Sequence, residues 1–154
     1  MNHEAASIEE TLEEMSMREP PPHVLIAEDD DGMRQMMARS LREDGYDVIE
    51  VNCGVQLIRA LELFGSSMLP VELIITDVRM PGFSGLEVLE YLRYSGWSVP
   101  VVLMTEAGDE RTYAEARDLD ATMVLDVPFE MAAFRAAISP IVAPPSVRSK
   151  MVAA

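Results

Sequence analysis

The feature that most constrains the fold occurs five times along the chain: a short, mainly apolar run is followed by a segment with helical spacing of its apolar residues. Short apolar strands that alternate with helices form a parallel sheet covered by helices on both faces. The strands are predicted at residues 24–27, 46–51, 71–76, 101–105 and 121–126. Five such units are too few for an eight-stranded barrel, so we predict an open, doubly wound α/β sheet.

The helices are predicted from apolar side chains that recur three and four residues apart. In the first helix, Asp30 or Asp31 is expected to cap the start and Gly45 to end it. Its core-facing side is expected to hold Met33, Met36, Met37 and Leu41. The remaining helices are predicted at residues 55–64, 84–96, 109–119 and 129–138.

The length of 154 residues fits one domain, which we place at residues 23–142. Residues 143–154 are predicted to be a loose C-terminal tail, and residues 1–22 an acidic, flexible N-terminal extension. Two interpretations of the extension stay open. One is a frayed segment, which is favoured because short isolated helices are only marginally stable, and the other is an amphipathic helix. The helix would start with a capping box of Ser7 and Glu10 and carry Ile8, Leu12 and Met15 on one face.

The formal net charge of −15 argues against direct binding of nucleic acid, because the chain would repel a phosphate backbone. No apolar run is long enough to predict a membrane span, and the acidic N-terminus is unlike a signal peptide. Cys53 is the chain's one cysteine, so no disulfide can form within the chain. We therefore expect a cytoplasmic protein.

Several acidic residues follow the predicted strands at the edge where the strands end. Glu28 and Asp29 follow the first strand, and Asp77 follows the third. The carboxyl ends of neighbouring parallel strands meet in one crevice, where three carboxylates repel each other unless a cation compensates. Mg²⁺ prefers such oxygen ligands. The alternative is that the acids at 28–31 only cap the following helix, which leaves Asp77 unexplained.

Asp77 ends an apolar strand and precedes a loop shaped by Pro81, Gly82 and Gly85. A carboxylate held there can act as a nucleophile toward phosphorus, with the metal ion neutralising charge on the phosphoryl oxygens. The loop alone does not exclude the alternative that Asp77 caps a following turn.

The segments VLIAEDD, ITDVRMPGFSG, LMT and VPF, in this order and spacing, resemble response-regulator receiver domains of two-component signalling over residues 23–142. The resemblance implies a flavodoxin-like fold with strand order 2-1-3-4-5. It also implies that the protein is not an enzyme acting on other substrates. Its partners would be a histidine kinase or phosphotransfer protein and an unknown downstream protein, with a homodimer as a further assembly that the family uses.

The resemblance also assigns roles to individual residues. Asp77 is similar to the phosphoacceptor, and Thr105 to the hydroxyl that binds a phosphoryl oxygen and shifts when the domain switches. Asp29 and Asp77 would bind Mg²⁺ directly and Glu28 through water, with the backbone carbonyl of Arg79 as a further ligand. A cis peptide is expected before Pro128. Arg34 is interpreted as a solvated surface charge.

Three positions depart from the family pattern. Val127 stands where the family has a lysine that pairs with the phosphoryl group, and Lys150 in the tail is the chain's one lysine. Glu106 replaces the small residue after the switch threonine, and Val124 replaces the aromatic residue that often swings with it. Loss of the lysine would remove about 1.5–3 kcal/mol of charge-assisted bonding.

Three functions are therefore compared. The first is a single-domain response regulator, without an output domain, that accepts a phosphoryl group on Asp77. The second is a degenerate receiver that binds its partner independently of phosphorylation. The third is an aspartate-nucleophile phosphatase, which would need a general-acid aspartate where the chain has Arg79.

Overall fold

The computed structural model describes residues 3–17, 20–65, 70–106 and 108–145. After an N-terminal helix, α1 (His3–Met17), strands and helices alternate along the chain. They are β1 (His23–Ala27), α2 (Asp31–Glu43), β2 (Asp47–Val51), α3 (Gly54–Gly65), β3 (Val71–Asp77), α4 (Gly85–Tyr94), β4 (Val101–Thr105), α5 (Glu110–Asp118), β5 (Met123–Asp126) and α6 (Met131–Ile138). Each predicted strand and each predicted helix of the domain is present, with ends that differ by a few residues.

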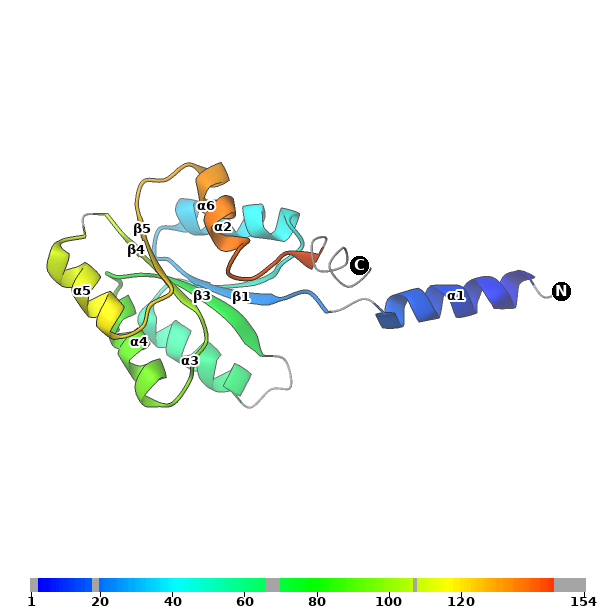
Figure 1. The fold of residues 1–154 in the computed structure, drawn as a ribbon, viewed down its shortest axis with the longest axis horizontal. Helices are drawn as coiled ribbons and strands as arrows, with labels where there is room; N and C mark the ends of the chain where they lie inside the picture. Colours follow the sequence, from blue (N-terminus) through cyan, green and yellow to red (C-terminus); the bar gives the residue numbers. More distant parts are fainter. Residues whose placement is uncertain (1–2, 18–19, 66–69, 107, 146–154) are drawn as a thin grey trace.

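The strands form one parallel, five-stranded sheet in the order β2-β1-β3-β4-β5. Helices α2 and α6 cover one face, and α3, α4 and α5 cover the other (Figure 1). The predicted fold class and strand order are confirmed. All strands end at the same edge of the sheet, where the loops to the following helices begin.

The core has two halves because side chains of a strand alternate between the faces of the sheet. In β1, Val24 and Ile26 pack toward α2 and α6, whereas Leu25 and Ala27 pack toward α3 and α4. All four side chains are fully buried. This two-sided burial explains why the strands are continuous apolar runs in the sequence.

Helix α2 begins as its sequence predicts. The carboxylate of Asp30 accepts a hydrogen bond of 2.7 Å from the backbone N–H of Met33. Met37 and Leu41 are fully buried, but Met36 is 60% exposed, so its predicted place in the core is wrong. A residue that directly precedes a core-facing one is turned by about 100° around the helix axis, which carries Met36 toward solvent.

The N-terminal extension forms a helix, which is one of the two interpretations of its sequence. The predicted capping box is wrong, because α1 already begins at His3 and Ser7 lies inside it. The Ser7 carbonyl accepts a hydrogen bond of 2.7 Å from the Thr11 hydroxyl. Ile8 and Leu12 are exposed, while the side chain of Met15 and most of the predicted tail lie outside the described residues. Within the described part of the chain, no helix has the length and apolarity that crossing a bilayer requires.

Candidate functional site

The predicted acidic residues converge at the carboxyl edge of the sheet. Glu28 and Asp29 follow β1, and Asp77 is the last residue of β3. Because β1 pairs with β3 so that Ala27 lies opposite Thr76, the residues that follow are neighbours. One carboxylate oxygen from each of the three acids lies within 4.8 Å of the others. Residues as far as 49 positions apart in the sequence, Glu28 and Asp77, thus belong to one cluster.

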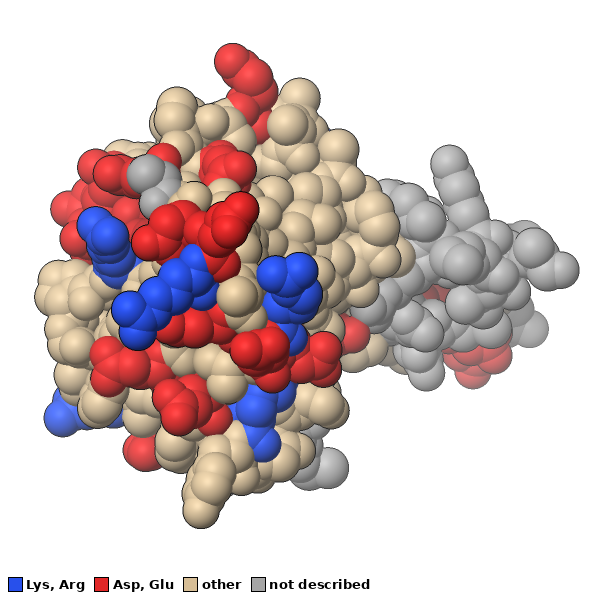
Figure 2. Space-filling view, turned by 60° about the vertical axis from the view of Figure 1, so that its left-hand side comes forward, with Lys and Arg blue, Asp and Glu red and all other residues tan. Residues whose placement is uncertain are grey.

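This cluster forms one wall of a hollow of about 540 Å³. Figure 2 brings this edge of the molecule forward and shows that aspartate and glutamate side chains cover much of it, with a few arginines between them. The hollow also contains the other residues that the sequence singled out. Besides the three acids, its lining consists of Asp30, Met33, Arg79, Met104, Thr105, Glu106 and Val127.

The carboxyl of Asp77 is electrostatically unfavourable in its charged form. Burial is the largest cause, and together with the neighbouring acids it raises the pKa of Asp77 to about 9. The next cause is a hydrogen bond with Glu28, which can form only while one of the two carboxyls holds a proton. The charges of Glu28, Asp29 and Glu106 add to the effect. A positive charge in the hollow would reverse this balance and favour the ionised carboxylate.

Glu28 supplies a second observation that a cation fits here. Its side chain is buried, with 4% of the residue exposed. Its Oε1 accepts a hydrogen bond of 3.0 Å from the backbone N–H of Asp30, but its Oε2 has no hydrogen-bond partner in the described part of the chain. A buried carboxylate oxygen without a partner is costly. Glu28, Asp29 and Asp77 therefore have the oxygen-rich chemistry that suits Mg²⁺.

The loop after Asp77 is held close to the sheet. The backbone N–H of Val78 donates to the carbonyl of Met104 in β4 at 2.8 Å, and the N–H of Gly85 donates to the carbonyl of Val78 at 2.9 Å. A Cβ atom on Gly85 would lie 2.1 Å from the backbone oxygen of Asp77, so only glycine fits there. The glycine of the sequence motif thus allows α4 to start directly against the backbone of Asp77.

Thr105 and Val127 are neighbours in the lining of the same hollow. Thr105 ends β4 opposite Asp126, and its carbonyl accepts a hydrogen bond of 2.9 Å from the N–H of Val127. The predicted cis peptide between Val127 and Pro128 is present. Val127 therefore places an apolar side chain in the wall of the hollow that also holds Asp77. Glu106 also lines the hollow, and its predicted place at the entrance stays a prediction.

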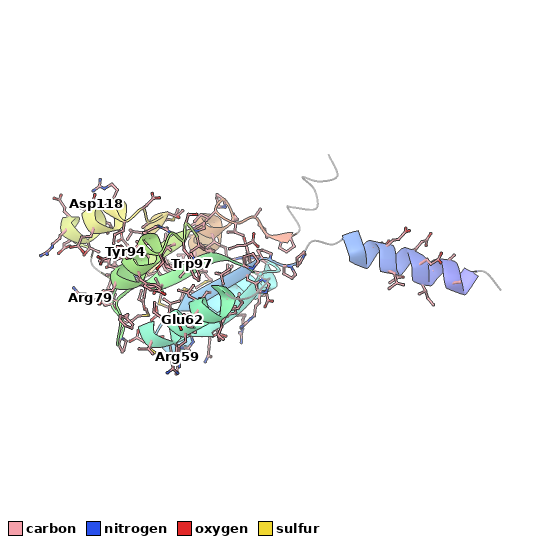
Figure 3. The ribbon with its side chains drawn as sticks, turned by 90° about the horizontal axis from the view of Figure 1, so that it is seen from below. Arg59, Glu62, Arg79, Tyr94, Trp97 and Asp118 are labelled. Atoms are coloured by element: carbon pink, nitrogen blue, oxygen red, sulfur yellow. The ribbon has the colours of Figure 1, made fainter. Side chains whose placement is uncertain are left out.

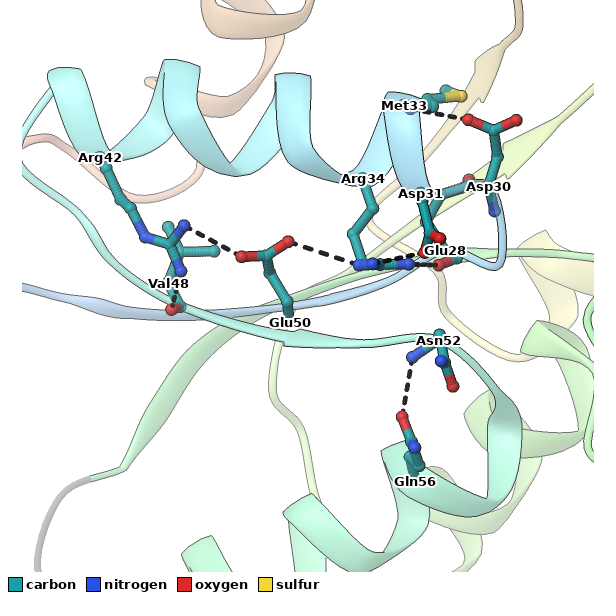
Figure 4. A network of polar contacts seen from close by, with 10 residues as sticks. All are labelled: Glu28, Asp30, Asp31, Met33, Arg34, Arg42, Val48, Glu50, Asn52 and Gln56. Atoms are coloured by element: carbon teal, nitrogen blue, oxygen red, sulfur yellow. Dashed lines mark hydrogen bonds and ion pairs between the residues drawn. The ribbon is translucent and has the colours of Figure 1, made fainter.

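Arg34 has a role that the sequence interpretation missed. It was expected to be a solvated charge, but its side chain is only 13% exposed. It donates to the backbone carbonyl of Glu28 at 3.0 Å and pairs with Asp31 at 2.6 Å and Glu50 at 3.4 Å (Figure 4). Glu50 also pairs with Arg42 at 3.0 Å. The interpretation failed because Glu50 lies on β2, which only the sheet places beside α2.

A second missed contact joins α5 to the end of β5. The hydroxyl of Tyr113 donates a hydrogen bond to the carboxylate of Asp126, which raises the pKa of Tyr113. The ring of Tyr113 covers Gly108, where a Cβ atom would lie 2.5 Å from the ring carbon Cζ. Gly108 is thus packed beneath an aromatic side chain of α5. No local sequence pattern connects Tyr113 with Asp126.

Comparison with known proteins decides the family. The family model of the response regulator receiver domain matches residues 24–139. The chain belongs to the response-regulator receiver family. The receiver domain is 37% identical over 125 residues to the transcriptional regulatory protein FixJ of Azorhizobium caulinodans, covering 77% of this chain and 53% of that protein. It is 34% identical over 109 residues to response regulator RR06 of Streptococcus pneumoniae, covering 71% of this chain and 48% of RR06.

Solved structures agree on the fold. Chemotaxis protein CheY4 of Vibrio cholerae has a TM-score of 0.69 at 24% identity, over 79% of this chain and 99% of CheY4. A response regulator from Chloroflexus aurantiacus has a TM-score of 0.68 at 26% identity, over 80% of this chain and 98% of that one. The chain spans about half the length of the curated relatives it matches. That no output domain accompanies this receiver domain stays a prediction.

Membership of the family implies interaction with histidine kinases or phosphotransfer proteins, and receiver domains generally bind Mg²⁺ at an acidic site. Glu28, Asp29 and Asp77 form an acidic cluster that could hold such an ion. The finer assignments, including the carbonyl of Arg79 as a ligand, a cytoplasmic location and dimerisation, stay predictions.

Proposed function

We propose that this receiver domain accepts a phosphoryl group on Asp77 from the phosphohistidine of a histidine kinase or phosphotransfer protein, and then signals through a changed affinity for a partner protein. The observation that carries the proposal is the convergence of Glu28, Asp29 and Asp77 within 4.8 Å, in one hollow with Thr105. This arrangement combines a nucleophilic carboxylate, ligands for a divalent cation and a hydroxyl for a phosphoryl oxygen.

The chain's own residues divide the work. A carboxylate oxygen of Asp77 attacks phosphorus while the bond to the histidine nitrogen breaks, so that the phosphoryl group moves to Asp77 and the histidine keeps the electron pair. The Thr105 hydroxyl donates a hydrogen bond to the transferred group. Glu28 and Asp29 would hold Mg²⁺, which when bound supplies positive charge for the phosphoryl oxygens. The protein changes only its own phosphorylation state, so we propose no enzymatic activity on other substrates.

The raised pKa of Asp77 adds a condition. Burial and the neighbouring acids raise the pKa of Asp77, which disfavours the ionised, nucleophilic carboxylate when no cation is bound. Ionisation of Asp77 is therefore proposed to depend on the charge that Glu28 and Asp29 recruit. This requirement supports a Mg²⁺-dependent reaction rather than metal-independent phosphorylation of Asp77 by a phosphodonor.

The test is to incubate the protein with a small phosphodonor such as acetyl phosphate, with and without Mg²⁺, and to measure the intact mass. We expect a phosphoryl adduct that requires Mg²⁺ and is absent in Asp77→Asn. Beryllofluoride, which mimics a bound phosphoryl group, should shift the NMR resonances of Thr105 and its neighbours. An unmodified mass and unchanged spectra under all conditions would refute the proposal.

Val127 favours a second candidate, a receiver domain whose partner binding is independent of phosphorylation. It places an apolar side chain in the wall where the family has a lysine. In that case a partner would bind wild type, Asp77→Asn and Asp77→Ala with equal affinity. This comparison requires the cognate kinase. The first proposal predicts that phosphotransfer from this kinase changes the affinity of wild type for the partner and leaves the affinity of both variants unchanged.

A further inference from the structure

An apolar groove lies between α3 and α4, on the sheet face opposite α2 and α6. Its volume is about 380 Å³. Ile58 of α3 and Val88 of α4 line it, together with Phe83 of the loop before α4 and Tyr91 and Tyr94 of α4. The α3–α4 groove, defined by these residues, is separate from the acidic hollow, whose lining it does not share.

Apolar exposure is concentrated around this groove. Nine large apolar or aromatic side chains are exposed in the described part of the chain, and three of them, Phe83, Tyr91 and Tyr94, line this groove. Tyr94 is 94% exposed, Phe83 45% and Tyr91 43%. Tyr91 and Tyr94 are three residues apart and therefore lie on one side of α4. Exposed aromatic side chains gathered in one groove with an acidic rim are typical of an interaction site.

The rim of the groove is acidic. Glu62 of α3 and Glu87 and Glu90 of α4 line it, and the described lining includes no lysine or arginine. Figure 3 shows Glu62 on α3 and Tyr94 on α4 from this side of the molecule. Arg93 of α4 does not neutralise the rim, because its guanidinium binds the backbone carbonyls of Trp97, Val99, Leu119 and Asp120.

We propose that the α3–α4 groove binds an amphipathic helix of another protein, with apolar side chains on the face that enters the groove and lysine or arginine along its flanks. A groove between two helices suits an inserted helix, whose anchors recur every three to four residues. The acidic rim selects for basic flanks and disfavours nucleic acid. Phe83 follows Asp77 in the same loop, so the groove begins where the phosphoacceptor loop ends.

Charge argues against a second copy of this chain as the occupant. Its own exposed amphipathic helix is α1, with Ile8 at 60% and Leu12 at 59% exposure. Helix α1 also carries Glu9, Glu10, Glu13 and Glu14, which would meet the glutamates of the rim. Like charges placed opposite each other cost affinity, so α1 of the same or a second chain is a poor ligand for this groove.

The test uses the full chain and two synthetic helical peptides of about 15 residues with leucine at helical spacing, one with lysine flanks and one with glutamate flanks. We expect the lysine peptide to shift the amide resonances of residues 83–94 and the glutamate peptide to leave them unchanged. Two double variants should each bind the lysine peptide at least about tenfold more weakly: Tyr91→Ala/Tyr94→Ala and Glu62→Lys/Glu90→Lys.

The control for overall charge is Glu9→Lys/Glu13→Lys in α1, which changes the net charge as much as the reversal on the rim does. It should weaken binding of the lysine peptide by less than about threefold. Equal weakening by both charge reversals, or resonance shifts outside the groove, would mean that the peptide binds only the overall negative charge and would overturn the proposal. Dimerisation in sedimentation that Leu12→Ser abolishes and that protects residues 83–94 would overturn it in favour of a second copy.

Discussion

Arg34 of α2 donates a hydrogen bond of 3.0 Å from Nη1 to the backbone carbonyl of Glu28. The same guanidinium pairs with Glu50 of β2 at 3.4 Å. The loop that carries Glu28 and Asp29 is therefore joined to the helix after it and to the neighbouring strand. This contact helps to hold the acids of the site where β1 ends.

Replacement of Arg34 by alanine is expected to cost about 2–3 kcal/mol of unfolding free energy, because it leaves partly buried acceptors without a donor. Arg42→Ala is the matched control on the same helix, since Arg42 also pairs with Glu50 but is 49% exposed and does not contact Glu28. It should cost about 0.5–1 kcal/mol. Urea denaturation measures both, and equal losses would argue against a special role for the contact with Glu28.

Stability of the metal-free protein should fall as pH rises. The pKa of Asp77 is about 9 in the folded state, against an ordinary value of 3.8 for the unfolded chain, so the folded state binds more protons between these values. The favourable contribution is complete below about pH 4 and is lost as pH rises through about 9. Asp77→Asn removes the charge and should be more stable than wild type by about 1–2 kcal/mol at about pH 8, a value reduced for partial solvation.

The measurement is thermal or urea unfolding in EDTA from about pH 5 to about pH 9. The advantage of Asp77→Asn should grow across this range and disappear when Mg²⁺ is added, because a bound cation stabilises wild type alone. Asp118→Asn, which removes a charge from the far end of α5, is the control. A constant difference between Asp77→Asn and wild type at every pH would contradict the prediction.

Val127→Lys should restore a positive charge in the wall of the acidic hollow. A lysine there can pair with a bound phosphoryl mimic, and this pairing contributes about 1.5–3 kcal/mol to the free energy of binding. Beryllofluoride with Mg²⁺ should therefore bind about 10- to 100-fold more tightly than to wild type. Val127→Met, which extends the side chain without a charge, should leave the affinity unchanged. If methionine tightens binding as much as lysine does, packing rather than charge explains the effect.

The link between Tyr113 and Asp126 can be followed through the ionisation of the tyrosine. The hydrogen bond from Tyr113 to Asp126 is the largest cause of its raised pKa, followed by burial and the charge of Asp126. In a spectrophotometric titration, Asp126→Asn should bring the pKa of Tyr113 down toward the ordinary tyrosine value. Tyr113→Phe identifies its signal. A titration curve that Asp126→Asn does not alter would show that the two side chains are not linked.

Much of the fold follows from local sequence patterns. The apolar runs predicted β1, β3 and β4 because a strand buried on both faces needs apolar residues at nearly every position, whereas β2 was predicted from the alternation of its residues. Asp30 and Gly45 marked the ends of α2 because capping and left-handed backbone are properties of residues within one helical turn. Local patterns misplaced two residues. Met36 was assigned to the core because neighbouring apolar residues fitted more than one orientation of α2, and Ser7 was assigned as a cap because the polar residues fitted more than one start of α1.

The sequence by itself determined the strand ends at which Glu28, Asp29, Asp77 and Thr105 lie, since each follows or completes an apolar run. Only the tertiary structure decided which side chains meet. Pairing of β1 with β3 brings Glu28 beside Asp77, and pairing of β1 with β2 brings Glu50 within reach of Arg34. The α3–α4 groove and the bond from Tyr113 to Asp126 also join separate elements. The physical reason is that periodicity and capping act over a few residues, whereas these contacts depend on sheet register and helix packing across the whole domain.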